Sequence, residues 1–259
     1  MQSLVAPGSQ AEQVGRLLIA VIAVLALPAL PFGIYLAYPF AILTTWFHEM
    51  GHGLTASILG QQFERLVILA DGSGYALSRV ASDLSGPARA FIAAGGPLGP
   101  VLAGAALIMA SAHRAAWRPA LWGLSAIIFA SVIVYVRSPT GYFVLPLVAA
   151  GVALIAWRAS PGIVRFTLQF LGILAAMSML RDFNYLFTEQ IVIEGRRQLS
   201  DTGQIEAALL LPHWFWAALI LALSATVIGA SLKYALAERR RRRRPRKLPS
   251  NVAQFRRKR

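Results

Sequence analysis

The stretch TTWFHEMGHGLTASILG, residues 44–60, places two histidines and a glutamate near the end of a long apolar segment. Residues 17–47 contain no charged side chain, and the apolar character continues to Leu59. A polar or titratable side chain inside a membrane is costly unless a partner compensates its lost hydration. The three polar side chains of this stretch therefore indicate a functional site within a membrane helix.

The composition is that of a polytopic membrane protein. Of the 259 residues, 57% are hydrophobic and 14% are charged, and the mean hydropathy is +0.59. A transmembrane helix needs about 20 mostly apolar residues to cross a hydrocarbon core of about 30 Å. Since several stretches meet this requirement, we predict an all-α fold, a transmembrane helical bundle of about six to seven spans.

The first apolar segment is too long for one span. A straight helix over residues 17–59 would measure about 60 Å, about twice the hydrocarbon thickness. We expect a break at LPALPFG, residues 27–33, or at Pro39, because proline lacks a backbone donor. The second helix would then run from about Phe40 to Gly60. Further spans are expected at residues 90–112, 119–136, 138–157, 166–187 and 214–232.

Two polar intervals interrupt the apolar pattern. In residues 61–89, Asp71 and Gly72 lie between two β-prone runs, which is a hairpin signal. We predict strands near residues 66–70 and 75–80. Residues 188–211 are expected outside the membrane, with a short helix that opens at SDTGQ, residues 200–204. We divide the chain into an N-terminal flank, 1–15, a transmembrane domain, 16–237, and a basic tail, 238–259.

Much of the formal charge of +14 lies in the tail, where residues 239–244 are six consecutive arginines. A segment with so little apolar content cannot bury a core, so we expect it to be disordered and to bind anionic lipid headgroups. Nucleic acid is not an expected partner, because no base-reading module is present. The positive-inside rule predicts a multi-pass protein of the cell membrane with a cytoplasmic C-terminus. The loops holding Arg114 and Arg158 would share that side, whereas Arg137 would lie on the other.

The motif HEMGH, residues 48–52, has the spacing of a zinc site. Residues four apart lie on one helix face, so His48 and His52 can direct their imidazoles at one metal ion. Zinc lowers the pKa of a bound water to about 7, and Glu49 could then act as the catalytic general base. The chain has no cysteine, so any metal must use His, Asp or Glu. The alternative is that the histidines form interhelical hydrogen bonds and Glu49 reaches the membrane surface.

A catalytic zinc needs a third protein ligand. We favour Asp182, in MSMLRDFNYLF, because it ends an apolar helix where an unpaired carboxylate is costly. Asp201, in LSDTGQIEAAL, stays open as the alternative, although it could instead cap a helix in a capping box with Gln204. His113 is expected in a solvated loop, and His213 is expected to anchor a helix at the membrane interface.

The membrane-embedded HEMGH, the DGSG hairpin, the GGPLGP segment at residues 95–100 and a late aspartate together resemble the site-2 protease type of intramembrane zinc metallopeptidase. More narrowly, the chain resembles the compact bacterial branch without a PDZ domain, over roughly residues 40–235. The resemblance implies a helical bundle with zinc near one membrane face, bound by His48, His52 and a late aspartate, with Glu49 as base. The family aspartate is usually followed by glycine, whereas Phe183 follows Asp182.

The expected function is that of a zinc-dependent intramembrane endopeptidase, which hydrolyses peptide bonds within or near the transmembrane segments of other membrane proteins. The resemblance also implies that an extended substrate adds as a strand beside the hairpin. The alternative is a non-catalytic membrane protein, a scaffold or transporter, with a structural metal site or none. The sequence does not indicate an oligomeric state.

Overall fold

The computed structural model describes residues 10–181, 183–193 and 195–242, and the chain is mostly helical. The helices are α1 (Gln10–Ala26), α2 (Gly33–Ile58), α3 (Gly86–Ala112), α4 (Trp117–Val134), α5 (Pro139–Arg158), α6 (Pro161–Arg181), α7 (Phe183–Leu186), α8 (Asp201–Leu209) and α9 (His213–Arg242), with short 3-10 turns η1 (Leu27–Ala29) and η2 (Arg114–Ala116). The strands are β1 (Gln62–Ile68), β2 (Gly74–Arg79), β3 (Gln190–Ile193) and β4 (Arg196–Leu199). Each predicted span has a helix, which confirms the all-α bundle, although the two spans expected in residues 17–59 form one bent pair, so the candidate spans number five or six.

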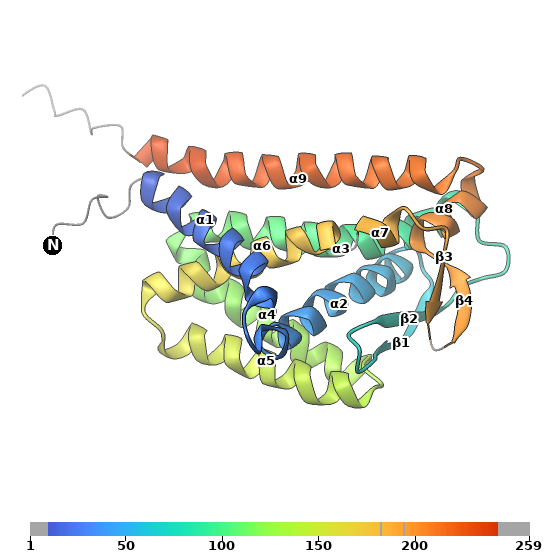
Figure 1. The fold of residues 1–259 in the computed structure, drawn as a ribbon, viewed down its shortest axis with the longest axis horizontal. Coiled ribbons are helices and arrows are strands. Elements are labelled where there is room, and N and C mark those ends of the chain that lie inside the picture. The colour runs from blue at the N-terminus through green and yellow to red at the C-terminus, as the bar shows by residue number, and fades with distance from the viewer. Residues whose placement is uncertain (1–9, 182, 194, 243–259) are drawn as a thin grey trace, which may run out of the picture.

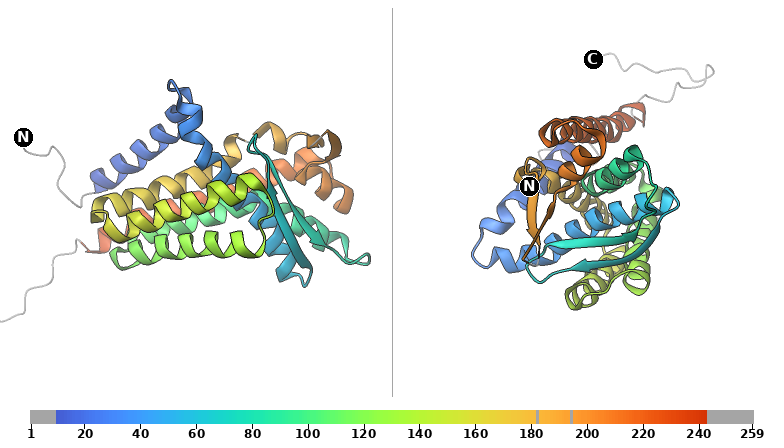
Figure 2. Two further views of the ribbon diagram at one scale, coloured as in Figure 1. Left: turned by 90° about the horizontal axis from the view of Figure 1, so that it is seen from below. Right: turned by 90° about the vertical axis from the view of Figure 1, so that its right-hand side faces the viewer.

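The helices α3, α4, α5, α6 and α9 run roughly along the long axis of the molecule, whereas α1 and α2 cross them obliquely, and the strands lie at one end (Figures 1 and 2). Five helices of the described chain are long and apolar enough to cross a membrane, and the bent pair α1 and α2 would make a sixth. The two hairpins and α8 lie together at one end of the bundle, which we call the hairpin end. The first turn of α1 and the last turn of α9 lie at the opposite end (Figures 1 and 2).

The long apolar segment breaks at LPALPFG, as predicted. Pro28 lies in η1, Phe32 adopts a positive φ of 61°, and the axes of α1 and α2 differ by 119°. The predicted start of the second helix near Phe40 is wrong, because α2 begins at Gly33 and contains Pro39. A proline in the second turn removes one backbone hydrogen bond but does not end the helix.

The predicted hairpin is present as β1 and β2, which pair antiparallel from Gln62 with Arg79 to Ile68 with Gly74. Asp71 closes the turn by accepting hydrogen bonds from the backbone N–H and the hydroxyl of Ser73, at 2.9 and 2.7 Å. The outer edge of β1 is occupied, because Leu66 exchanges backbone hydrogen bonds with Tyr135 and Arg137, both at 2.9 Å. Within the described residues, β2 pairs with β1 alone.

The second hairpin, β3 and β4, is absent from the sequence-based expectations. Its strands pair from Gln190 with Leu199 to Ile193 with Arg196, and Gly195 in the turn has a φ of 74°. The β-branched run IVI, residues 191–193, with Gly195 two positions after it, is a hairpin signal that could have been found in the sequence. Each strand has only four residues, so the run is too short to stand out among apolar segments.

Close contacts between small residues pack α3 against its neighbours. A Cβ atom added at Gly104 of α3 would lie 2.5 Å from the carbonyl oxygen of Gly172 and 2.9 Å from the backbone nitrogen of Ala176, both in α6. Small residues allow this approach of helix backbones in membrane bundles. A buried hydrogen bond of 2.8 Å from the indole of Trp46 to the hydroxyl of Ser131 joins α2 to α4.

We expect Gly104→Ala to destabilise the fold by about 1–3 kcal/mol, because the added methyl group meets backbone atoms that no rotamer change can move. Thermal unfolding of the detergent-purified protein measures the effect. Gly123→Ala in α4 is the matched control, because a Cβ there has no neighbour within 4 Å. Equal melting temperatures for the two variants would contradict the close α3–α6 contact.

Candidate metal centre

The two histidines of HEMGH lie on one face of α2, and α3 passes directly beneath them. A Cβ atom on Gly96 of α3 would collide with the ring of His52 and would lie 2.7 Å from Nε2 of His48. Gly99 also lies close to α2, since its Cβ would lie 2.7 Å from the carbonyl oxygen of Phe47 and 3.0 Å from the Cα of Gly51. The GGPLGP segment therefore serves the site by leaving room for both imidazoles between the two helices.

The carboxylate of Asp201 completes the cluster. Its Oδ2 lies 3.0 Å from Nε2 of His48, and its Oδ1 lies 3.1 Å from Nε2 of His52. The two Nε2 atoms are 3.2 Å apart. Asp201 is 2% exposed, and Glu49, on the neighbouring face of α2, is 6% exposed. The structure thus brings together two imidazoles and one carboxylate from elements about 150 residues apart in sequence.

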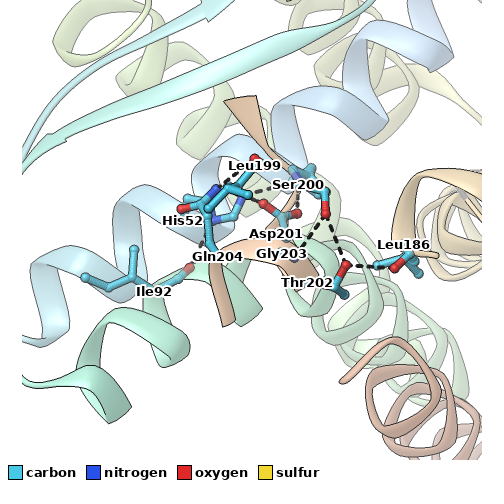
Figure 3. A network of polar contacts seen from close by, with 10 residues as sticks. His52, Ile92, Leu186, Leu199, Ser200, Asp201, Thr202, Gly203 and Gln204 are labelled. Carbon is cyan, nitrogen blue, oxygen red and sulfur yellow. Dashed lines mark hydrogen bonds and ion pairs between the residues drawn. The ribbon is translucent and has the colours of Figure 1, made fainter. Parts of the chain in front are cut away.

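Asp201 is free to face the histidines because Ser200 caps α8 in its place. The Ser200 hydroxyl accepts a hydrogen bond of 3.1 Å from the backbone N–H of Gly203, so the capping role considered for Asp201 is wrong. The start of α8 is held in turn by a 2.7 Å hydrogen bond from the hydroxyl of Thr202 to the carbonyl of Leu186 (Figure 3). The backbone N–H of Ser200 also donates to the carbonyl of Glu189, at 2.8 Å.

The donor atoms of the cluster fit a metal ion. Nδ1 of His52 lies 2.9 Å from the carbonyl oxygen of Ile92, an acceptor, so Nδ1 carries the proton and Nε2 of the neutral ring presents a lone pair (Figure 3). This lone pair faces a carboxylate, and Oδ2 of Asp201 has no hydrogen-bond partner among the described residues. A cation shared by the three groups would remove the repulsion between these atoms.

The spacing of the cluster also suits zinc. Tetrahedral coordination with bonds of about 2.0–2.1 Å places ligand atoms about 3.3 Å from one another. The two Nε2 atoms are 3.2 Å apart, and each lies 3.0–3.1 Å from one of the two Asp201 oxygens. With one ligand atom per residue, the three atoms all lie within 4.8 Å of one another. A metal ligand must be deprotonated, and a cation held beside Asp201 would favour the ionised carboxylate over the neutral acid.

A cleft of about 430 Å³ opens beside the cluster at the hairpin end. His48 and Glu49 form one wall, the turn of the first hairpin forms another, and β3 faces them. Tyr185 of α7 also lines the cleft, with its ring edge-on to His48 at a centroid distance of 6.1 Å. The cleft gives a ligand access to Glu49 and to the side of the cluster that α3 and α8 do not cover.

The structure brings some of the predicted site residues together but not all of them. His48, Glu49 and His52 lie together as expected, whereas Asp182 lies outside the described residues. The expectation for His113, a loop residue, is confirmed, and its ring contacts the Tyr234 hydroxyl at 3.0 Å. The backbone N–H of His213 donates a hydrogen bond to Oε2 of Glu206, and Nδ1 of the His213 ring lies 2.9 Å from the same oxygen. These contacts lower the pKa of the Glu206 carboxyl. Tyr185, which lines the cleft, is not among the predicted site residues, because a single tyrosine in an apolar segment belongs to no recognisable motif.

The bundle and the cluster define a polytopic membrane protein with a candidate HExxH metal centre. A comparison with protein-family models matches residues 17–231 of the 259 to the family described as Peptidase M50B-like. The chain therefore belongs to this family of membrane metallopeptidases, as the resemblance to site-2 proteases predicted. Searches of curated proteins and of solved structures return no match.

We expect Asp201→Ala to lose most of the bound metal, because it removes one of the three clustered ligand groups. Asp182→Ala is the matched variant, since it removes the other candidate carboxylate and should retain the metal. Elemental analysis of both purified proteins, loaded with zinc and then dialysed, makes the comparison. Loss of zinc from the Asp182 variant, with retention by the Asp201 variant, would reverse the assignment.

Proposed function

We propose that the chain is a zinc-dependent intramembrane endopeptidase whose metal ligands are His48, His52 and Asp201. The observation that carries the proposal is the three-donor cluster beside Glu49, at a cleft in an apolar helical bundle. A structural zinc site is closed by four protein ligands, whereas a catalytic site keeps one position open. Three ligands next to an accessible cleft favour the catalytic type over a structural metal in a scaffold or transporter.

The protein side chains have separate roles in the proposed hydrolysis. Zinc, when bound, would activate a water molecule and polarise the scissile carbonyl group. Glu49 would accept a proton from the attacking water and deliver it to the leaving amine. The hydroxyl of Tyr185, which lines the cleft next to His48, would donate a hydrogen bond to the carbonyl oxygen as negative charge develops there. His52 would stay oriented through its bond to Ile92.

The substrate would bind as an extended segment between the two hairpins. The outer edge of β1 is already occupied by residues 135–137, so β2 offers the edge to which a peptide strand could add. Gly74, at the start of β2, packs close to the catalytic base, since a Cβ there would lie 3.3 Å from Cγ of Glu49. We propose transmembrane proteins as substrates, because the site lies within an apolar bundle and an extended strand exposes its carbonyl groups.

We expect Glu49→Gln to reduce cleavage of a model transmembrane substrate by about 10²-fold or more, because the amide cannot accept the proton. Zinc content should remain near one ion per chain, since Glu49 is outside the three-ligand cluster. A gel assay of the purified variant and elemental analysis of the same sample test both expectations. Full activity in this variant would exclude the mechanism.

We expect Tyr185→Phe to lower kcat by about 10²-fold, the usual effect of removing one donor to a developing oxyanion, with little change in KM. The phenyl ring keeps the packing against His48, so zinc content should not change. Steady-state kinetics with the same substrate separates the two parameters. An unchanged kcat would show that the hydroxyl has no part in the reaction.

A further inference from the structure

The first hairpin packs against α2, the helix that carries both histidines and Glu49 (Figures 1 and 2). Tyr38, Thr45 and Glu49 are separated by seven and four residues, so their side chains follow one face of this helix. The hydroxyl of Tyr38 donates a hydrogen bond of 2.9 Å to the carbonyl of Ala70. Oγ1 of Thr45 donates a hydrogen bond of 2.6 Å to the carbonyl of Gly72. The helix face that presents the base therefore also holds the turn of the hairpin.

The bond from Thr45 is the one closest to the reacting groups. Thr45 is one helical turn before Glu49, about 6 Å along the axis, and both side chains line the cleft. Gly74, the first residue of β2, lies against both of them. A Cβ atom at Gly74 would lie 2.8 Å from Cγ2 of Thr45 and 3.3 Å from Cγ of Glu49. Thr45 thus contacts the start of β2 through its methyl group and the preceding turn through its hydroxyl.

The two strands of the hairpin are held in different ways. The outer side of β1 is fixed to the connection between α4 and α5, because Leu66 pairs with residues 135–137 and the backbone N–H of Ile68 donates to the hydroxyl of Ser138 at 3.0 Å. Among the described residues, β2 has no ladder partner other than β1. The position of the β2 edge therefore depends on the ladder with β1 and on the contacts of the hairpin with α2.

We propose that Thr45 is a positioning residue, whose hydrogen bond to Gly72 fixes the edge of β2 relative to Glu49 and the metal cluster. The inference rests on the proposed peptidase function, in which a substrate strand adds to that edge. A peptide bound there takes its position relative to the base from β2. Because a displacement of about 1 Å between reacting groups can cost about 10²-fold in rate, the hydroxyl of Thr45 contributes to the reaction through the position of this edge.

Two substitutions separate the hydrogen bond of Thr45 from its packing. Thr45→Val keeps a methyl group against Gly74 and replaces the hydroxyl with a group that cannot donate. Thr45→Ser keeps the hydroxyl and removes the methyl group. Thr226→Val in α9 is the matched control, because Thr226 is exposed, donates to the carbonyl of Ala222 in its own helix at 2.8 Å and does not line the cleft.

Hydrogen exchange of the full chain in detergent, followed by mass spectrometry, tests the hydrogen bond without an activity assay. The backbone N–H groups of Leu69 and Gly72 donate within the turn, to the carbonyls of Ser73 and Leu69. We expect Thr45→Val to raise the exchange rate of these amides about 2- to 10-fold, the effect of losing one hydrogen bond of ordinary strength. Thr45→Ser and Thr226→Val should exchange like the parent chain. Equal exchange in Thr45→Val and the parent chain would overturn the proposal.

Steady-state cleavage of a model transmembrane substrate tests the consequence for the reaction. We expect Thr45→Val to lower kcat by about 10-fold with little change in KM, because the peptide still pairs with β2 but is displaced from Glu49. Thr45→Ser should return kcat to near the parental value. Zinc content near one ion per chain, and a melting temperature equal to that of Thr226→Val, distinguish this effect from a general loss of structure.

The two measurements together decide between the outcomes. Faster exchange with an unchanged kcat in Thr45→Val would show that the edge need not be held, and would overturn the proposal. Loss of zinc from Thr45→Val, or a low kcat that Thr45→Ser does not restore, would also overturn it. If the parent chain cleaves no substrate, the peptidase function is removed instead, and the exchange rates still decide whether Thr45 holds the turn.

Discussion

The repulsion among three electron-pair donors is the constraint around which this bundle is arranged. His48, His52 and Asp201 hold their ligand atoms 3.0–3.2 Å apart in a buried site, where water cannot compensate their charge and lone pairs. Removing such groups from water costs several kcal/mol unless a cation or hydrogen bonds replace it. A shared metal ion would offset this cost and would link α2 to α8, which are far apart in sequence.

The elements around the cluster contribute no ligand atoms of their own, but they make room for the three ligand groups and hold them in place. Gly96 lets α3 pass beneath the imidazoles, Ser200 takes over the cap of α8, and the carbonyl of Ile92 orients His52. The two hairpins frame the remaining open side and form the cleft to Glu49.

The bundle could be predicted because long apolar runs leave few alternatives in a membrane, where every backbone group must bond within a helix. The DGSG hairpin was found for a similar local reason, since Asp71 and Gly72 specify the turn. The start of α2 and the second hairpin were not found. Pro39 breaks a helix only where neighbouring contacts do not hold it, and the four-residue strands of residues 190–199 depend on packing against distant segments.

The sequence by itself determined that His48 and His52 lie together with Glu49 beside them, because residues four apart on a helix share a face whatever surrounds them. It also restricted the third ligand to a late aspartate, but it favoured Asp182 over Asp201. Only the tertiary structure decided which carboxylate lies beside the imidazoles, since that depends on the path of the chain from α7 through the second hairpin to α8. The physical reason is the sequence distance between the contacting residues. Helical spacing relates residues a few positions apart, whereas Asp201 approaches His48 and His52 only because the start of α8 is hydrogen-bonded to the carbonyl groups of Leu186 and Glu189, which no spacing in the sequence reveals.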